Sequence, residues 1–200
     1  MEFVGYGEAI ELLKEQGIEE IEDDDGRVSL QLIAGDEVRQ LHLTCRESEC
    51  EPREGAAVVM VERDQLPEAV ENIIQKLHLS QMLLIPVAKW RKVFDAVAFS
   101  MVDNQDWQAV DTAATVELNT RDPLLCEPGD FQTVNALVKA LFSDAESVEH
   151  GLMITTTAAP VMVEIVPQGA VRISVGNAVL ADELAATLHS RPWARPEASS

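Results

Sequence analysis

The sequence predicts an α+β fold in which mainly antiparallel sheets pack against helices. Two patterns alternate along the chain: apolar residues at helical spacing, and short segments rich in Val, Ile and Leu that are typical of strands. The predicted strands are joined by short turns with Gly or Pro, which suit antiparallel pairs because parallel pairs need longer crossovers. Apolar residues make up 46% of the 200 residues and charged residues 25%, as in an ordinary globular domain.

Five segments place apolar residues along one face of a helix. In the first, Ile10 and Leu13 share a face and Gly17 ends the helix. In the second, Pro67 lies in the first turn, where its missing N–H is tolerated. Asp130 is a suitable N-cap for the fourth. The predicted helices span residues 6–16, 66–79, 88–101, 131–142 and 180–189.

The first strands are predicted to form a β-hairpin at residues 27–45, with its turn at Gly35-Asp36. The acidic run EEIEDDD at residues 19–25 precedes this hairpin and is interpreted as a solvated turn that ends at Gly26. Further strands are predicted at residues 56–62, 82–86, 114–120, 152–157, 161–166 and 170–175, with loops at 46–56, 103–106 and 121–129.

The order of predicted elements divides the chain into two halves. Residues 6–79 and residues 131–189 both have the order α-β-β-β-α. We therefore predict an acidic half at residues 1–79, a second α+β half at residues 80–190 that contains the other unit, and a flexible tail at residues 191–200. The two halves form separate domains or fold together as one.

Two stretches of the sequence resemble each other. LLIPVAKWRKVFDAVAFS begins at Leu83, and LLCEPGDFQTVNALVKALFS begins 41 residues later at Leu124. The register is lost beyond the helices, so a common apolar face explains the likeness better than a duplication does. The polar residues differ, since KWRK at 89–92 stands against DFQT at 130–133.

The chain is strongly acidic, with 35 acidic and 15 basic residues and a net charge of −20. Residues 1–80 alone hold 20 acidic and 7 basic side chains. This field repels nucleic acid and anionic membranes, so we predict neither as a partner and expect any protein partner to be basic. We find no secretory signal and no apolar run long enough to span a membrane. An odd count of three cysteines is typical of a reducing cytoplasm.

His42, Cys45 and Cys50 form the pattern H-x-x-C-x-x-x-x-C, and imidazole and thiolate groups are zinc ligands. A fourth ligand is missing, and His42 and Cys45 would point to opposite faces of a strand. The alternative interpretation is a strand end followed by a polar loop.

The run DDDG at 23–26 does not fit an EF-hand calcium loop. Such a loop would need oxygen ligands at Ile21 and Leu32, whose side chains contain no oxygen. We predict no cofactor.

The densest basic cluster is Lys89, Trp90, Arg91 and Lys92. It is a candidate docking point for a partner, with Trp90 as an aromatic anchor and the cations around it. In the alternative interpretation, Trp90 faces the core and the cations meet water or the acidic segments of the chain itself.

The acidic α-β-β-β-α order of residues 6–79 resembles, in outline, the small acidic secretion chaperones. That resemblance implies a non-enzymatic dimer that holds a protein partner, and it assigns no residue because no motif is shared. We therefore predict a cytoplasmic, non-enzymatic protein-binding module, chaperone- or adaptor-like, that forms a homodimer. The alternative is a small enzyme or ligand-binding domain whose site assembles only in three dimensions. Its candidate residues are His42, Glu117, His150, Glu164 and Arg172.

Overall fold

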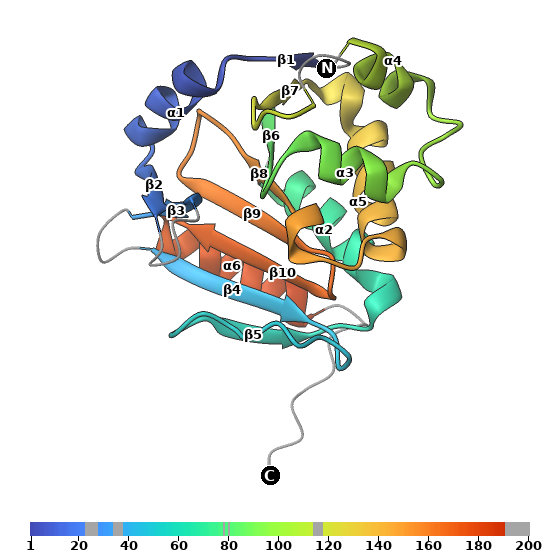
Figure 1. Ribbon diagram of the computed structural model, residues 1–200. Helices are drawn as coiled ribbons and strands as arrows, with labels where there is room; N and C mark the ends of the chain where they lie inside the picture. The colour runs from blue at the N-terminus through green and yellow to red at the C-terminus, as the bar shows by residue number, and fades with distance from the viewer. Residues whose placement is uncertain (23–27, 34–37, 78, 80, 114–117, 191–200) are drawn as a thin grey trace.

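A large mixed sheet with helices on one face organises the chain, as Figure 1 shows for the computed structural model. The structure describes residues 1–22, 28–33, 38–77, 79, 81–113 and 118–190, and within these the large sheet has eight strands and a small sheet has two. Helix α1 and the small sheet pack on the opposite face. The α+β class predicted from the sequence is confirmed.

The elements have the following bounds. The large sheet contains, in spatial order, β1 (Glu2–Phe3), β7 (Leu124–Cys126), β6 (Met82–Pro86), β8 (Leu152–Thr155), β9 (Val161–Val166), β10 (Ala170–Val175), β4 (Arg39–Thr44) and β5 (Ala57–Met60). The small sheet pairs β2 (Ile18–Glu22) with β3 (Val28–Leu32). The helices are α1 (Tyr6–Glu15), α2 (Leu66–Lys76), α3 (Trp90–Val97), α4 (Gln105–Ala113), α5 (Phe131–Asp144) and α6 (Ala178–His189). The β4–β5 pair is parallel.

The predicted hairpin at residues 27–45 is wrong in its pairing. Strand β3 pairs with β2, and β4 pairs instead with β10 over six residues, from Thr44 opposite Ala170 to Arg39 opposite Val175. Residues 19–22 of the acidic run belong to β2 rather than to a turn, whereas residues 23–26 lie outside the described residues. Backbone hydrogen bonds do not depend on side-chain charge, and Glu19, Glu20 and Glu22 are all exposed, so the strand accommodates the glutamates.

Three further differences concern short elements. Strand β7 occupies part of the segment predicted as a loop at 121–129, and α4 begins within the loop predicted at 103–106. Trp107 and Val110 of α4 are buried at helical spacing, a pattern that is present in the sequence. Of the strand predicted at 114–120, residues 118–120 form a turn, and residues 114–117 lie outside the described part of the chain.

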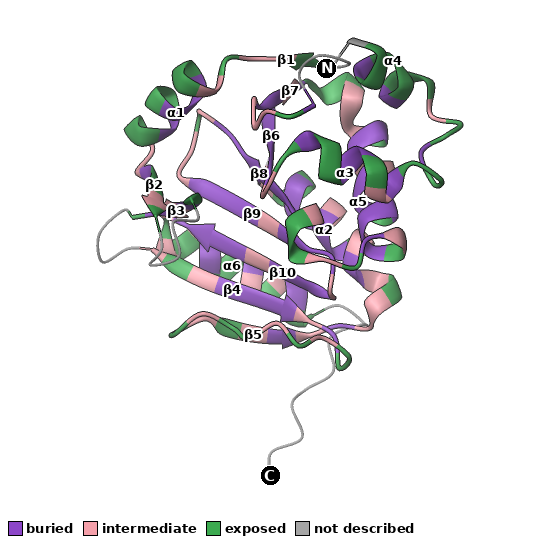
Figure 2. Cartoon of the chain, in the orientation of Figure 1, coloured by how far each residue is buried: buried purple, intermediate pink, exposed green. Residues whose placement is uncertain are grey.

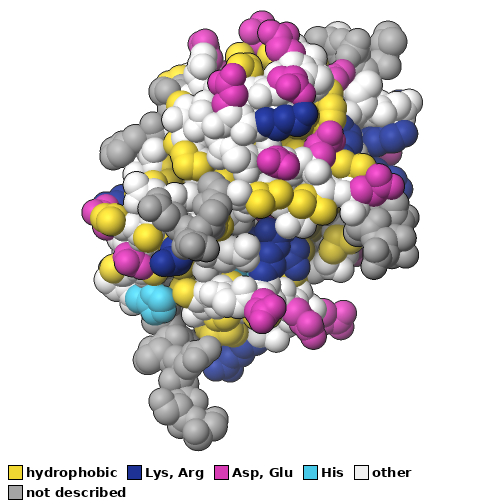
Figure 3. All heavy atoms as spheres, turned by 90° about the vertical axis from the view of Figure 1, so that its left-hand side faces the viewer, with side chains coloured by type: hydrophobic (Ala, Val, Ile, Leu, Met, Phe, Trp, Pro, Cys, Tyr) yellow, Lys and Arg dark blue, Asp and Glu magenta, His cyan; other side chains and the backbone are white. Residues whose placement is uncertain are grey.

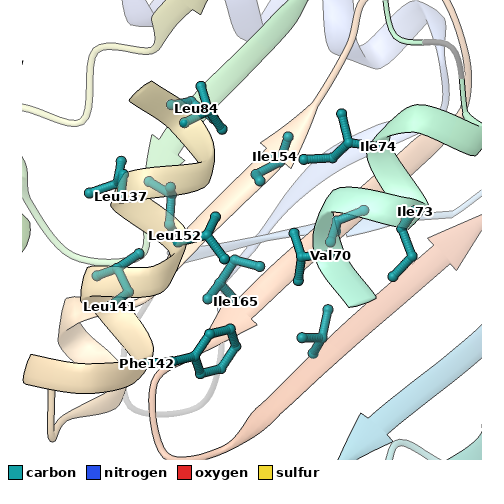
Figure 4. Packing of buried hydrophobic residues seen from close by; sticks show 14 of the residues in the cluster. Val70, Ile73, Ile74, Leu84, Leu137, Leu141, Phe142, Leu152, Ile154 and Ile165 are labelled. Carbon is teal, nitrogen blue, oxygen red and sulfur yellow. The ribbon is translucent and has the colours of Figure 1, made fainter. Parts of the chain in front are cut away.

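The main core lies between the helices and one face of the large sheet. In Figure 4, the apolar side chains of α2 and α5 meet those of β6, β8 and β9. Figure 2 shows the central strands as almost wholly buried. The predicted apolar faces of the helices are confirmed, because the side chains that share the helical spacing are buried. They include Val70, Ile73, Ile74, Val93, Phe94, Val97, Val134, Val138 and Leu141.

A second, smaller core lies on the other face of the sheet. There Ile10 and Leu13 of α1 and Leu30 of β3 belong to one apolar cluster with Met153 and Met162 of the large sheet. The glutamates of α1 and of β2 are all exposed at the surface of this layer. The outer surface of the α1 layer therefore carries six of the acidic residues of the N-terminal segment.

The two similar stretches each form a strand followed by a helix. Their strands pair with each other, with Leu83 opposite Leu125 and Leu84 opposite Leu124, and α3 packs on α5. The matched helix residues Val93 and Val134 both lie in the main core, whereas the matched strand residues Leu83 and Leu124 point to opposite faces of the sheet.

The large sheet combines strands from both predicted halves, because β4 and β5 join it beside β10. The division at residue 79 stays a prediction, and the tail at 191–200 lies outside the described residues. None of the described helices is both long enough and apolar enough to cross a membrane.

The turn between β9 and β10 depends on Gly169, whose φ is +101°. A Cβ there would overlap the Cys45 sulfur, so we expect Gly169→Ala to lower the free energy of unfolding by about 2–5 kcal/mol, from backbone strain and overpacking together. Gly55→Ala is the control, because Gly55 also has positive φ but has open space around it, and it isolates the backbone term of about 1–2 kcal/mol. Urea denaturation measures both variants, and equal losses would contradict the overlap.

Candidate functional site

Three polar side chains lie side by side on neighbouring strands of the large sheet. His42 of β4 is directly opposite Arg172 of β10, and Arg172 is directly opposite Glu164 of β9. We call these three residues the polar row. They point away from the main core, because side chains alternate along a strand and the neighbours Leu41 and Leu43 belong to that core. In Figure 1, α6 lies behind these strands and the face with the polar row is turned toward the viewer.

The segment at residues 46–56, which joins β4 to β5, lies against the polar row. Arg172 Nη2 donates to Cys50 Sγ at 3.0 Å and to the Glu51 carbonyl at 3.4 Å. Arg53 Nη2 is 3.2 Å from Glu164 Oε2, and Arg172 Nη1 is 3.4 Å from Glu164 Oε1. One carboxylate thus serves two guanidinium groups, and these contacts tie the 46–56 loop to the sheet.

His42 is buried, with 1% of its surface exposed, and neither ring nitrogen makes a hydrogen bond of normal geometry. Burial lowers the pKa of His42, and the positive charge of Arg172 lowers it further, whereas the Cys50 backbone and the Glu164 carboxylate act in the opposite direction. Burial also raises the pKa of Cys50, which the charge of Arg172 partly offsets. At neutral pH the polar row therefore contains a neutral imidazole, and the Cys50 thiol that contacts Arg172 is protonated.

The predicted zinc ligands do not come together as a group. His42 and Cys50 both adjoin Arg172, but Cys45 is buried in the main core on the other face, next to Gly169. In the part of the chain that the structure describes, no three His, Cys, Asp or Glu side chains are placed to hold a metal ion.

The basic cluster surrounds a buried tryptophan. Trp90 is fully buried, its Nε1 donates to the Asp122 carbonyl at 2.7 Å, and its ring meets those of Phe94 and Trp107. The flanking cations are exposed, and Lys92 pairs with Glu149 at 3.3 Å. Trp90 thus serves as a core residue in this structure, and its surface is not available to a partner as an anchor.

A second candidate site is an apolar groove of about 210 Å³ between α1 and the large sheet. We call it the α1 groove. It lies where Ala9 and Leu12 of α1 approach Leu83 of β6 and Leu125 of β7, with Glu8 at its wall. A neighbouring hollow of about 230 Å³ shares Leu125 and is lined by Glu2 and Glu127. Figure 3 views the molecule from this side, with acidic side chains gathered over its upper part and apolar side chains reaching the surface between them.

The three residues of the polar row were predicted from the sequence as separate candidates, whereas Arg53 was not predicted. His42, Glu164 and Arg172 converge, whereas His150 lies in a short turn at Val148–His150 and Glu117 is not among the described residues. The local signal was clear for Glu164 and Arg172, each the one ionisable residue of a mainly apolar strand, whereas β4 also contains Arg39 besides His42. Arg53 carried no such signal, because it lies in a polar loop whose course the local sequence does not determine.

Comparisons of this chain with protein-family models, with curated proteins and with solved structures find no match. The site must therefore be interpreted from its own geometry.

The burial of His42 predicts a pH dependence of stability. The unfolded chain binds a proton on His42 near its ordinary pKa of 6.5, whereas the folded protein binds it only at lower pH. Between that lower pH and about 6.5 the unfolded state holds more protons on His42, so the free energy of unfolding falls as the pH drops through this range.

We expect His42→Gln to reduce the slope of the free energy of unfolding against pH by up to about 1.4 kcal/mol per pH unit, which is the slope that the uptake of one proton produces. Urea denaturation between about pH 7.5 and about pH 5.5 measures the slope. His189→Gln, which removes an exposed histidine from α6, is the control for losing a histidine elsewhere. An unchanged slope in His42→Gln would refute the role given to burial.

Proposed function

We propose that the protein is a non-enzymatic protein-binding module and that the α1 groove receives a basic segment of its partner. One observation carries the proposal: an apolar groove lies directly beside a hollow lined by carboxylates. Leu12 and Leu125 supply apolar contact, and Glu2, Glu8 and Glu127 supply negative charge next to it. A segment with an apolar anchor and adjacent Lys or Arg side chains is complementary to both.

The size of the α1 groove favours a protein segment over a small molecule. Its 210 Å³ is below the range of about 300–1,000 Å³ that small-molecule sites occupy. Such a volume accepts one or two side chains from a longer segment, in the manner of a helix or strand laid against a groove. Leu12, which is 44% exposed at the rim, would be covered by such a segment.

The charge of the chain favours a basic partner. A net charge of −20 attracts cationic segments over several ångströms and speeds their association, while it repels nucleic acid. We propose a chaperone- or adaptor-like role in the cytoplasm. Light scattering measures the molar mass of the protein and so distinguishes a homodimer from a monomer.

A ligand-binding domain is the second candidate, and the convergence of His42, Arg172 and Glu164 on adjacent strands favours it. These side chains form a polar site that is separate from the α1 groove, so both functions are compatible with one chain.

Selection from a displayed library of random peptides tests the groove. We expect the enriched peptides to combine an aliphatic or aromatic residue with Lys or Arg, and their affinity to fall with rising salt. Leu12→Lys replaces an apolar contact by a cation that repels the peptide, so we expect Kd to rise at least about tenfold, or about 1.4 kcal/mol. Calorimetry with one enriched peptide measures the change.

Val179→Lys is the matched control, because Val179 is 68% exposed on α6 and the substitution changes the net charge equally. It is expected to bind like the unaltered protein. Enrichment of peptides without basic residues, or equal weakening in both variants, would rule out the α1 groove as the binding site.

A further inference from the structure

We propose that the polar row, together with Arg53, is a binding site for a small oxyanion, either a carboxylate or a phosphate group. The inference does not rest on the α1 groove, since none of its residues lines that groove. It follows from the local balance of charge, from unpartnered polar atoms and from the way in which the 46–56 loop is held.

The balance of charge within the site is positive. Two guanidinium groups, those of Arg53 and Arg172, share the single carboxylate of Glu164, while His42 is neutral. The nitrogen–oxygen distances are 3.2–3.5 Å, longer than the roughly 2.7–2.9 Å of a strong charge-assisted hydrogen bond. Both arginine side chains are less than a third exposed, so water compensates this excess of positive charge only in part.

Four buried polar atoms on this face of β4 and β10 have no hydrogen-bond partner among the described residues. They are Gln40 Oε1, His42 Nδ1, His42 Nε2 and Arg172 Nε. Gln40 lies two residues from His42 on β4, so both side chains point to the same face. Arg172 Nε is an N–H donor that lacks an acceptor, whereas the His42 ring has the Cys50 backbone beside it. Buried donors without partners are costly, and an oxyanion supplies the acceptors that they need.

The two groups that accept hydrogen bonds from Arg172 Nη2 are weak acceptors for a charged donor. They are the neutral thiol of Cys50 and the backbone carbonyl of Glu51, both on the 46–56 loop. A charged oxygen acceptor forms roughly twice as strong a hydrogen bond with a guanidinium group. A modest outward shift of the loop would exchange these two contacts for two oxygens of the ligand. The pleated face of β10 and β4 would then form the floor of the site, on the side turned toward the viewer in Figure 1.

Nuclear magnetic resonance of the full chain tests this site. Inorganic phosphate and sodium acetate are titrated separately at constant ionic strength, with sodium chloride as the balancing salt. We expect saturable shifts of the Arg172 Nε–H signal and of the backbone amides of the 46–56 loop. Saturation by phosphate alone assigns a phosphate ligand, and saturation by acetate alone assigns a carboxylate ligand.

Two variants give opposite expectations. Arg172→Gln removes the central donor, and we expect at least about tenfold weaker binding. Glu164→Gln removes the carboxylate that competes with the ligand, and we expect binding to tighten by about the same factor. Arg46→Gln is the matched control, because Arg46 is an exposed arginine of the same loop that makes no ion pair with the described residues.

The absence of saturable shifts with both anions overturns the proposal, as does an equal response in chloride alone. Weakening by Arg46→Gln as large as that by Arg172→Gln would indicate a general effect of charge and also overturns it. Should Arg172→Gln fail to fold, the sign of the change in Glu164→Gln decides, since unchanged or weaker binding contradicts the site.

Discussion

The pairing of β4 with β10 is the interaction on which the rest of the structure depends. Six residue pairs, from Thr44–Ala170 to Arg39–Val175, join the N-terminal segment to the C-terminal hairpin β9–β10. Strand β5 enters the large sheet only through β4, and α6 packs across β4, β5 and β10. The same register places Leu41 and Leu43 in the main core and sets His42 opposite Arg172. A slip by one residue would exchange the two faces of β4 and destroy both arrangements.

The two faces of the large sheet differ in how completely they are buried, because different elements pack on each face. Helices α2, α3, α5 and α6 bury one face with apolar side chains, and α1 with the small sheet covers β6, β8 and β9 on the other. Over β9, β10 and β4 that second face meets the 46–56 loop, which leaves Arg172 and Glu164 partly exposed, while His42 is buried. The α1 groove and the polar row both belong to this second face, where the cover is partial. Binding surfaces are expected where backbone elements leave a sheet incompletely covered.

The candidate sites show which parts of a site can be inferred from local sequence. His42, Glu164 and Arg172 were each predicted as candidate residues of a site that forms only in three dimensions. Their convergence required the strand order, because they are separated by up to 130 residues in the chain. The proposed zinc pattern grouped His42 with Cys45 by proximity in sequence, yet strand alternation sends Cys45 into the main core. Trp90, interpreted as either an anchor or a core residue, proved to be a core residue because its indole N–H finds the Asp122 carbonyl inside the protein.

The sequence by itself determined five of the six described helices, all but α4, together with the α+β class and the net negative charge. Helical periodicity is a local property, so the apolar faces of α1, α2, α3 and α5 could be predicted residue by residue. Only the tertiary structure decided which strands pair, because ladder hydrogen bonds are made by the backbone, and many strands with apolar faces can satisfy them. The acidic segment at 19–22 therefore became a strand beside β3, and β4 left its predicted hairpin for β10. The polar row and the α1 groove result from that strand pairing, and no short stretch of the sequence predicts either of them.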